Sequence, residues 1–243
     1  MSEEILVITR PGGKQCAHLI PMLYNKGRFK LRLAAHTEAS ASKLKQQYPD
    51  AEVIQTDITS LAACQSLLTG ATAINAVLPS LHSREREIGL NFVDAAVAES
   101  QRQGSVFKHF VFSSLVFTQS RMLMQHDIKS YVEERLYLSP LNWTLLKPCN
   151  FMDAYPVPLL ANQHQPVVEK PWDPDIGNNM IALHDLAEAS AKDALDVGKR
   201  VLTCKPLSSH IVDGIYKPTA HAHDMRCEAD LSSHAIVDAV VWP

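Results

Sequence analysis

Short apolar runs alternate with longer amphipathic segments along most of this chain. The apolar runs have the length of strands and occupy residues 5–9, 29–35, 52–55, 73–78, 109–113, 143–147 and 200–204. Runs such as Phe110-Val111-Phe112 are apolar at successive positions, which is typical of strands that are covered on both faces. Strands that alternate with helices predict repeated βαβ units and a parallel sheet.

The segments between these runs carry apolar residues at helical spacing. They span residues 14–26, 39–47, 61–68, 85–101, 128–138 and 183–196. Because crossovers between parallel strands are right-handed, we predict an α/β fold with a doubly wound, Rossmann-like parallel sheet. Ligands of such sheets bind at the carboxyl ends of the strands, where the strand order reverses. We therefore expect the functional site among the loops that follow the strands.

The regular alternation weakens from Asp153 onward. Prolines punctuate the next segment, at positions 156, 158, 166, 171 and 174, and predict an irregular C-terminal cap over the sheet edge. We divide the chain into a dinucleotide-binding domain at residues 1–152 and a cap or substrate region at 153–243 that completes the sheet. Residues 208–243 have little helical periodicity, so we interpret them as an atypical or truncated tail.

Composition narrows the classes of function. The 243 residues carry a formal net charge of −3, without the basic excess of a nucleic-acid-binding protein, so no nucleic-acid partner is expected. No apolar run approaches the roughly 18 residues of a membrane span, so no membrane association is expected. The sequence opens without a basic segment followed by an apolar one, and the expected location is the cytoplasm.

The five cysteines are widely spaced and form no C-x-x-C pair. This pattern predicts reduced thiols rather than a disulfide framework or a zinc site. His221, His223 and Asp224 lie near Cys227, but their spacing fits no zinc pattern, and a solvated tail is the simpler interpretation. We expect no bound metal.

The turn after the first predicted strand contains the parts of a phosphate cradle. It consists of Arg10, Pro11, Gly12, Gly13, Lys14 and Gln15, and a helix follows. Free backbone N–H groups and the helix dipole favour an anion there, and the two glycines allow a positive φ. The dinucleotide motif has three glycines; with Gly13 as the middle one, Arg10 and Cys16 occupy the other two positions. Arg10 either pairs with the phosphates or blocks them.

Several further motifs occur in a characteristic order. They are IT at 8–9 with GKQ at 13–15, QTD at 55–57, NFVDAA at 91–96, KHFVFSS at 108–114, HDIKSYVEE at 126–134, LKPCNFM at 146–152 and LHDLAEA at 183–189. Through these motifs the chain resembles the NmrA-like branch of the atypical short-chain dehydrogenases/reductases. The resemblance implies a Rossmann-like fold with a small cap that binds NADP or, alternatively, NAD.

Two functions follow from the resemblance. Some members of the family are oxidoreductases or isomerases that act on small carbonyl compounds, and this chain would then take a small organic, biosynthetic substrate. Other members are non-catalytic sensors that respond to NAD(P)H and bind a regulatory protein partner. The sequence leaves both functions open, and we take the enzyme as the leading hypothesis.

The resemblance also assigns residues to the cofactor. His36 stands where relatives bind the 2′-phosphate of NADP, although an exposed histidine without this role fits equally well. Asp57 and Ile58 would flank the adenine ring, and Asp57 alternatively caps the following helix. Two loops would border the nicotinamide side: Leu78 and Pro79, and then Pro148, Cys149, Asn150 and Phe151. Cys149 is interpreted as an inert thiol rather than a redox-sensitive one, because nothing nearby predicts a lowered pKa.

The candidate catalytic residues are Ser113, Ser114, His126 and Lys129. Related dehydrogenases use a serine after the central strand and a tyrosine four residues before a lysine. Gln125 occupies that tyrosine position, and its amide neither gives nor takes a proton near neutral pH. His126 shares a helix face with Lys129 and could replace the tyrosine. Alternatively, Lys129 is solvated or only binds the nicotinamide ribose.

Overall fold

The computed structural model describes residues 4–27, 29–154 and 179–195, together with strands at 203–207, 211–212 and 215–216. Its main feature is a seven-stranded sheet in which every strand is parallel to its neighbours, in the order β3-β2-β1-β4-β5-β6-β9. These strands are β1 (Glu4–Ile8), β2 (Phe29–Ala35), β3 (Glu52–Gln55), β4 (Ala73–Val77), β5 (His109–Ser113), β6 (Trp143–Pro148) and β9 (Thr203–Leu207). The order reverses between β1 and β4, so the predicted doubly wound sheet is confirmed.

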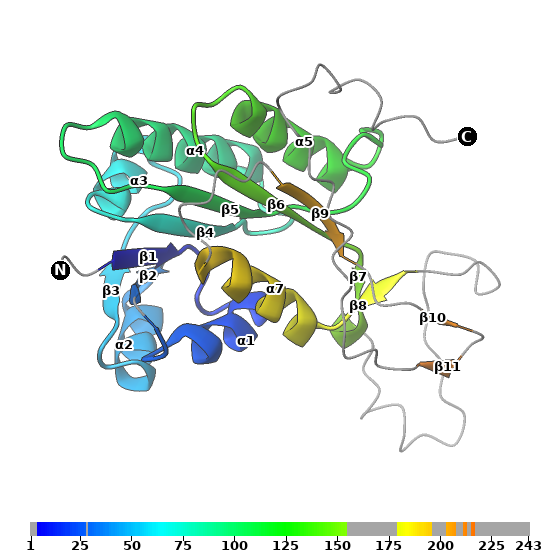
Figure 1. Ribbon diagram of the computed structural model, residues 1–243, viewed down its shortest axis with the longest axis horizontal. Coiled ribbons are helices and arrows are strands. Elements are labelled where there is room, and N and C mark those ends of the chain that lie inside the picture. Colours follow the sequence, from blue (N-terminus) through cyan, green and yellow to red (C-terminus); the bar gives the residue numbers. More distant parts are fainter. Residues whose placement is uncertain are drawn as a thin grey trace.

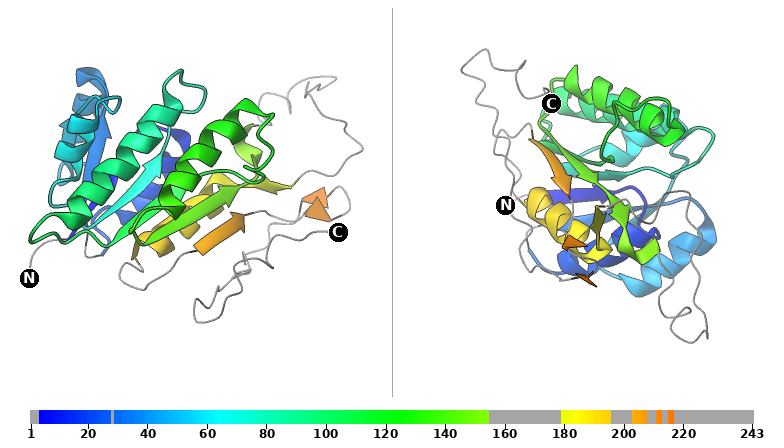
Figure 2. Two further views of the ribbon diagram at one scale, coloured as in Figure 1. Left: turned by 90° about the horizontal axis from the view of Figure 1, so that it is seen from above. Right: turned by 90° about the vertical axis from the view of Figure 1, so that its right-hand side faces the viewer.

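Helices cover both faces of this sheet (Figure 1). One layer contains α1 (Lys14–Leu23), α2 (Glu38–Gln47) and α7 (Leu183–Leu195), and the other contains α3 (Leu61–Leu68), α4 (Glu85–Gln101) and α5 (Met124–Tyr137). Figure 2 shows α4 and α5 side by side across their face of the sheet. The loops after the strands therefore gather at one edge between the two layers.

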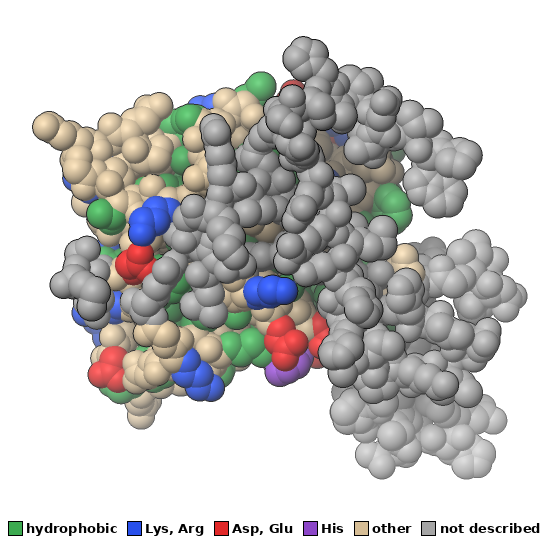
Figure 3. Space-filling view, in the orientation of Figure 1, with side chains coloured by type: hydrophobic (Ala, Val, Ile, Leu, Met, Phe, Trp, Pro, Cys, Tyr) green, Lys and Arg blue, Asp and Glu red, His purple; other side chains and the backbone are tan. Residues whose placement is uncertain are grey.

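Apolar side chains fill the space on each side of the sheet. Phe110 and Phe112 of β5 join the core under α4 and α5, whereas Val111 between them packs with Leu186 of α7 on the opposite face. Successive residues of a strand point to opposite faces, so a run that is apolar throughout supplies both cores. In the view of Figure 3, positive and negative side chains are interspersed over the described part of the surface.

The predicted start of α5 and the predicted position of the last strand differ from the structure. Helix α5 begins at Met124 instead of residue 128, after the N-cap residue Leu123, whose side chain makes no capping hydrogen bond. Without a capping side chain, the sequence carries no signal for this start. The helix therefore includes Gln125 and His126. The last strand of the sheet lies at 203–207 rather than 200–204, where it pairs with β6.

Part of the segment after residue 152 completes the layers of the fold. Helix α7 packs against α1, and β9 extends the sheet beside β6. The remaining elements are short: β7 (Asn150–Phe151) pairs with β8 (Met180–Ile181), the 3-10 helix η1 spans Met152–Ala154, and β10 (Ile211–Val212) pairs with β11 (Ile215–Tyr216). The proline-rich part of the predicted cap at 155–178 and the tail with His221, His223 and Cys227 lie outside the described residues.

Candidate functional site

Three cavities lie in a row along the carboxyl ends of the strands. The first has a volume of about 330 Å³ and lies over the ends of β1 and β2, the second has about 230 Å³, and the third has about 650 Å³ and lies beside β5 and β6. Arg10 and Gly13 line both the first and the second cavity. Gln15, Leu78 and Phe151 line both the second and the third. The cavities thus form one cleft across the point where the strand order reverses.

The first cavity is apolar at its base and basic at its rim. Ile58, Pro79 and Ile88 are among its apolar lining residues, while Arg10, His36 and His82 are basic lining residues. His36 is exposed at the end of β2, where the sequence placed it. None of the described residues that line this cavity is acidic. A negatively charged group is therefore tolerated there better than a positive one.

Asp57 shapes the loop that walls this cavity. Its Oδ1 accepts hydrogen bonds from the backbone N of Thr59 at 3.0 Å and from Thr59 Oγ1 at 2.6 Å, and these bonds lower the pKa of Asp57. The interpretation of Asp57 as a helix cap is wrong, because Ser60 caps α3 by accepting from the backbone N of Ala63. Ile58 lines the cavity, whereas Asp57 is not among the lining residues. Asp57 acts on this wall through the turn that it stabilises.

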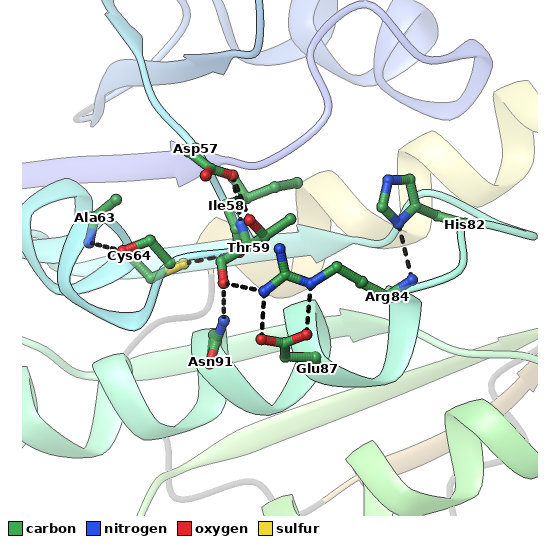
Figure 4. Close-up of polar contacts among 10 residues, drawn as sticks. Asp57, Ile58, Thr59, Ala63, Cys64, His82, Arg84, Glu87 and Asn91 are labelled. Atoms are coloured by element: carbon green, nitrogen blue, oxygen red, sulfur yellow. Dashed lines mark hydrogen bonds and ion pairs between the residues drawn. The ribbon is translucent and has the colours of Figure 1, made fainter.

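The same loop is tied to the start of α4 (Figure 4). The Thr59 carbonyl accepts from Arg84 Nη2 at 3.2 Å and from Asn91 Nδ2 at 3.1 Å. Arg84 also forms a bidentate ion pair with Glu87, and its backbone N donates to His82 Nδ1 at 3.0 Å. These contacts hold the wall of the first cavity against α4.

The phosphate-cradle turn leads into the second cavity. Arg10 Nη1 donates to the Leu78 carbonyl at 3.2 Å, which places the guanidinium at the junction of the first and second cavities. Helix α1 starts after Gly13 with no side-chain cap and no acidic residue in its first turn. Gly13, Lys14 and Gln15 line the second cavity at this helix end. A helix N-terminus, a guanidinium and a lysine together favour an anion.

The two glycines of this turn do not use a positive φ. Of the described glycines, those with positive φ are Gly27, Gly70 and Gly104. Gly13 instead permits a close approach, because a Cβ there would lie 3.2 Å from the Arg10 carbonyl oxygen. Cys16 replaces the third glycine without disrupting the packing: it is fully buried in the core beneath α1, and burial raises its pKa to about 12.

Lys129 lies at the inner wall of the third cavity and is not a solvated lysine. Its residue is 5% exposed, its Nζ lies 3.1 Å from Glu85 Oε1, and it lies 5.4 Å from the centre of the Phe112 ring. Burial lowers the pKa of Lys129, and the Glu85 carboxylate opposes that shift. A buried lysine with a lowered pKa can exchange a proton at a pH closer to neutrality than a free lysine.

Glu85 is a residue of this site that no sequence pattern identified. It is fully buried in the first turn of α4, where its Oε2 accepts from the backbone N of Leu81 at 2.9 Å. An acidic residue in the first turn of a helix is ordinary, because it complements the helix dipole. The spacing to Lys129 therefore offered no signal of the pair.

His126 enters the third cavity one helical turn before Lys129. Its Nδ1 lies 2.7 Å from the Phe117 carbonyl oxygen, which only accepts, so Nδ1 carries the proton. In the neutral ring, Nε2 is then free to accept a proton. Gln125 also lines this cavity. The structure thus brings together His126 and Lys129, which the sequence paired by helix face.

The two candidate serines have different surroundings. Both line the third cavity, and Ser113 Oγ donates to the amide oxygen Oε1 of Gln15, another lining residue, at 2.8 Å. Ser114 Oγ instead donates to the buried Glu133 carboxylate, which also accepts from Lys147 Nζ at 2.8 Å. The Ser114 hydroxyl is thus held by a buried carboxylate, whereas the Ser113 hydroxyl is held by a neutral amide and is the easier of the two to redirect to a ligand.

The loop after β6 forms the opposite wall of the third cavity. Pro148, Cys149, Asn150 and Phe151 all line it, as the resemblance implied for the nicotinamide side. Burial raises the pKa of Cys149 to about 11, so its thiol is protonated at neutral pH. This protonation agrees with an inert cysteine.

In the described part of the chain, no group of three or more His, Cys, Asp or Glu side chains could hold a metal ion. No helix among these residues combines the length and the apolar character needed to cross a membrane.

Solved structures of other proteins share this fold. The NADPH-dependent quinone oxidoreductase QOR2 of Escherichia coli, in complex with NADPH, matches with a TM-score of 0.68 and 20% identity over 84% of this chain and 69% of its own. NmrA, a negative transcriptional regulator, matches in complex with NAD with a TM-score of 0.69 and 19% identity over 86% of this chain and 68% of its own. NmrA in complex with NADP matches with a TM-score of 0.68 and 21% identity, over 86% of this chain and 67% of its own.

A search of curated proteins finds no match. The sequence does match the model of one protein family, over residues 1–208. This match spans every strand of the seven-stranded sheet and the whole of the cleft. The chain therefore belongs to the NmrA-like family.

Proposed function

We propose that this protein binds a nicotinamide dinucleotide along the three cavities and uses it to reduce a small carbonyl compound. The continuous cleft is the observation that carries the proposal, because it joins a basic rim, a helix N-terminus and a buried lysine in one row. The adenosine would occupy the first cavity, the pyrophosphate the second, and the nicotinamide the third. QOR2 with NADPH and NmrA with NAD or NADP support this choice of ligand.

NADP is the preferred cofactor in this proposal, and NAD is the alternative. None of the described residues lining the first cavity is an acid that could accept from a ribose 2′-hydroxyl, and this lining includes His36, His82 and Arg10 instead. An extra phosphate adds negative charge where these basic groups gather. Ile58, which lines the first cavity, would pack against the adenine ring, and Asp57 would support that wall through its turn with Thr59.

The chemistry in the third cavity requires a proton donor next to the substrate oxygen. The bound dinucleotide would supply a hydride to the carbonyl carbon, and Lys129 would deliver a proton to the carbonyl oxygen, so an alcohol forms. His126 would take up a proton from solvent on Nε2 and return it from there to Lys129, while its Nδ1 stays bonded to the Phe117 carbonyl. Ser113 would turn its hydroxyl from Gln15 Oε1 to the substrate oxygen and orient it by donating a hydrogen bond.

Equilibrium titration tests the proposal. Purified protein is titrated with NADPH, NADP, NADH and NAD, and the fluorescence of the reduced forms or calorimetry reports binding. We expect the Kd of NADPH to be at least about tenfold lower than that of NADH, because one additional charge-assisted hydrogen bond contributes about 1.5 kcal/mol and each ~1.4 kcal/mol changes Kd tenfold. Absence of binding by all four at millimolar concentration overturns the function.

Turnover is tested separately with a panel of small carbonyl compounds and quinones. Lys129→Met combined with Glu85→Gln removes the proton donor without leaving a buried carboxylate unpaired. We expect this pair to abolish NADPH oxidation at saturating cofactor while the folded state persists by circular dichroism. Full turnover in the double variant contradicts the role of Lys129.

A second function is favoured by Gln125, which lines the third cavity where related enzymes have a proton-donating tyrosine. In this alternative, the protein is a sensor whose dinucleotide occupancy changes its affinity for a regulatory protein. Tight cofactor binding without turnover of any panel compound favours the sensor. We also propose a cytoplasmic location and the division at residue 152, both of which rest on the sequence alone.

A further inference from the structure

The first turn of α4 places a buried carboxylate behind the third cavity. Glu85 has no solvent exposure, and each of its oxygens has one partner: Oε1 meets Lys129 Nζ at 3.1 Å and Oε2 accepts from Leu81 N at 2.9 Å. Neither contact involves a residue adjacent in sequence. A buried charge is strongly destabilising unless it is paired and hydrogen-bonded, so these two contacts are what make Glu85 tolerable there.

The charges around Lys129 make Glu85 its closest anionic partner. Glu133 lies on α5 with Lys129 and acts on it only through the electrostatic field, because its own carboxylate is bound by Lys147 at 2.8 Å. The positive charge of Arg10, from the phosphate-cradle turn, disfavours the protonated form of Lys129 and so contributes to lowering its pKa. Among the described residues, Glu85 is the one carboxylate hydrogen-bonded to Lys129.

Two uncharged or titratable groups complete these surroundings. The ring of Phe112, from β5, faces the ammonium group at 5.4 Å and stabilises a cation weakly. His126 lies one turn earlier on α5, and its Nδ1 is engaged with the Phe117 carbonyl. Neither group replaces a carboxylate as a direct partner of the ammonium.

The second contact of Glu85 fixes a strained loop. Leu81 has φ +64°, a left-handed conformation that is unfavourable for a leucine, and its side chain is 67% exposed. Packing of that side chain therefore contributes little to holding the backbone in this conformation. The hydrogen bond from the Leu81 backbone N to Glu85 is what stabilises it. Leu78 and Ser80 of the same loop line the second and third cavities.

We propose that Glu85 is the positioning residue of this site: its carboxylate orients the Lys129 ammonium group at the wall of the third cavity and holds the loop between β4 and α4 against it. The inference rests on the proposed function for the use made of Lys129. The pairing itself is a property of the protein without cofactor or substrate. Glu85 lines none of the three cavities and is not a catalytic residue.

The test measures the proton affinity of Lys129 directly. Protein labelled with ¹³C-lysine is titrated by NMR, and the Lys129 Cε signal is assigned by its loss in Lys129→Met. In Glu85→Gln, which is nearly isosteric and can still accept from Leu81 N, we expect the pKa of Lys129 to fall by about one unit or more, a tenfold loss of proton affinity. The reason is that burial then acts without the opposing carboxylate.

Asp94→Asn is the matched control. Asp94 forms an ion pair with Arg135 between the same two helices, at 2.6 Å, but both side chains are about 40% exposed and neither lines the cleft. We expect this variant to leave the pKa of Lys129 unchanged. A pKa that is the same in Glu85→Gln as in the wild type overturns the proposal, as does an equal fall in both variants.

A double-mutant cycle covers the case in which Glu85→Gln does not fold. Lys129→Met with Glu85→Gln should then fold and melt at the temperature of Lys129→Met or above it, because the two losses share one contact. A double variant that is unfolded as well shows that Glu85 does not act through Lys129, and it overturns the proposal. Failure of wild-type protein to bind any dinucleotide would overturn the proposed function and leave both of these readouts intact.

Discussion

Gly89 is the point at which α4 makes its closest approach to the elements around it. A Cβ at this position would lie 2.4 Å from Val132 Cγ2, 2.9 Å from Leu78 Cδ1 and 3.2 Å from Val132 Cγ1. Both neighbours are buried, and valine in a helix has essentially one χ1 rotamer, so Val132 cannot rotate away. Gly89→Ala therefore forces α4 and α5 apart.

The expected magnitude combines two opposing effects. Alanine in place of glycine inside a helix stabilises it by about 1 kcal/mol. Overpacking of a core costs about 1–3 kcal/mol, and two contacts under 3.0 Å put Gly89→Ala at the upper end of that range. The net loss in the free energy of unfolding is about 2 kcal/mol, which lowers the melting temperature of a chain of this size by about 4–8 °C.

Thermal and urea unfolding of Gly89→Ala measure this loss. Gly12→Ala is the matched control, because a Cβ there would meet nothing within 4 Å and φ is not positive. We expect the control to change the free energy of unfolding by no more than about 0.5 kcal/mol, as for other surface substitutions. If Gly89→Ala were as stable as the wild type, the close packing of α4 on α5 would be refuted.

Three further outcomes are expected. In the proposed binding mode the Arg10 guanidinium, at the junction of the first and second cavities, would face the pyrophosphate that NADPH and NADH share. Arg10→Ala should therefore weaken the binding of both by about tenfold or more, and an unchanged affinity in titrations contradicts that role. Glu99, whose pKa is lowered chiefly by its hydrogen bond from Arg102, stabilises the fold above the unfolded pKa of about 4.5, and this stability is lost as pH falls through the lower folded value. Glu99→Gln should flatten that part of the acid-unfolding curve, and a curve parallel to the wild type counts against it. Alkylation of Cys149 at pH 7.5, followed by mass spectrometry of its peptide, should be slow and rise about tenfold per pH unit towards its pKa of about 11; rapid reaction at neutral pH would show that the thiol is activated.

The order of the strands and helices could be predicted because each element has its own pattern of apolar residues over a few consecutive positions. The strands 29–35, 52–55 and 109–113 and the helices 61–68 and 85–101 have the bounds that their apolar periodicity predicted. The start of α5 was missed because Leu123 offers no capping side chain. The phosphate-cradle turn was found because such turns follow strands directly, whereas the loop 148–151 was assigned through the resemblance to the family.

The contacts that define the chemistry of the cleft could not be predicted from local sequence patterns, because they join residues that are remote in the chain. Lys129 and Glu85 are 44 positions apart, and Ser113 and Gln15 are 98 apart. A periodicity describes which face of an element is apolar, but not which polar groups from different elements are buried together. The distinction between Ser113 and Ser114 likewise depends on Glu133, which lies on α5.

The Rossmann-like order of elements, and the position of the loops that follow the strands, could be predicted from the sequence alone. The reason is that the burial of a strand or helix face determines the spacing of apolar residues over a few positions. Only the tertiary structure showed that Arg10 bridges two cavities, that Lys129 is buried against Glu85, and that Ser114 is occupied elsewhere. Pairing and desolvation of charges depend on the distance between elements that are remote in the chain, and folding is what sets that distance.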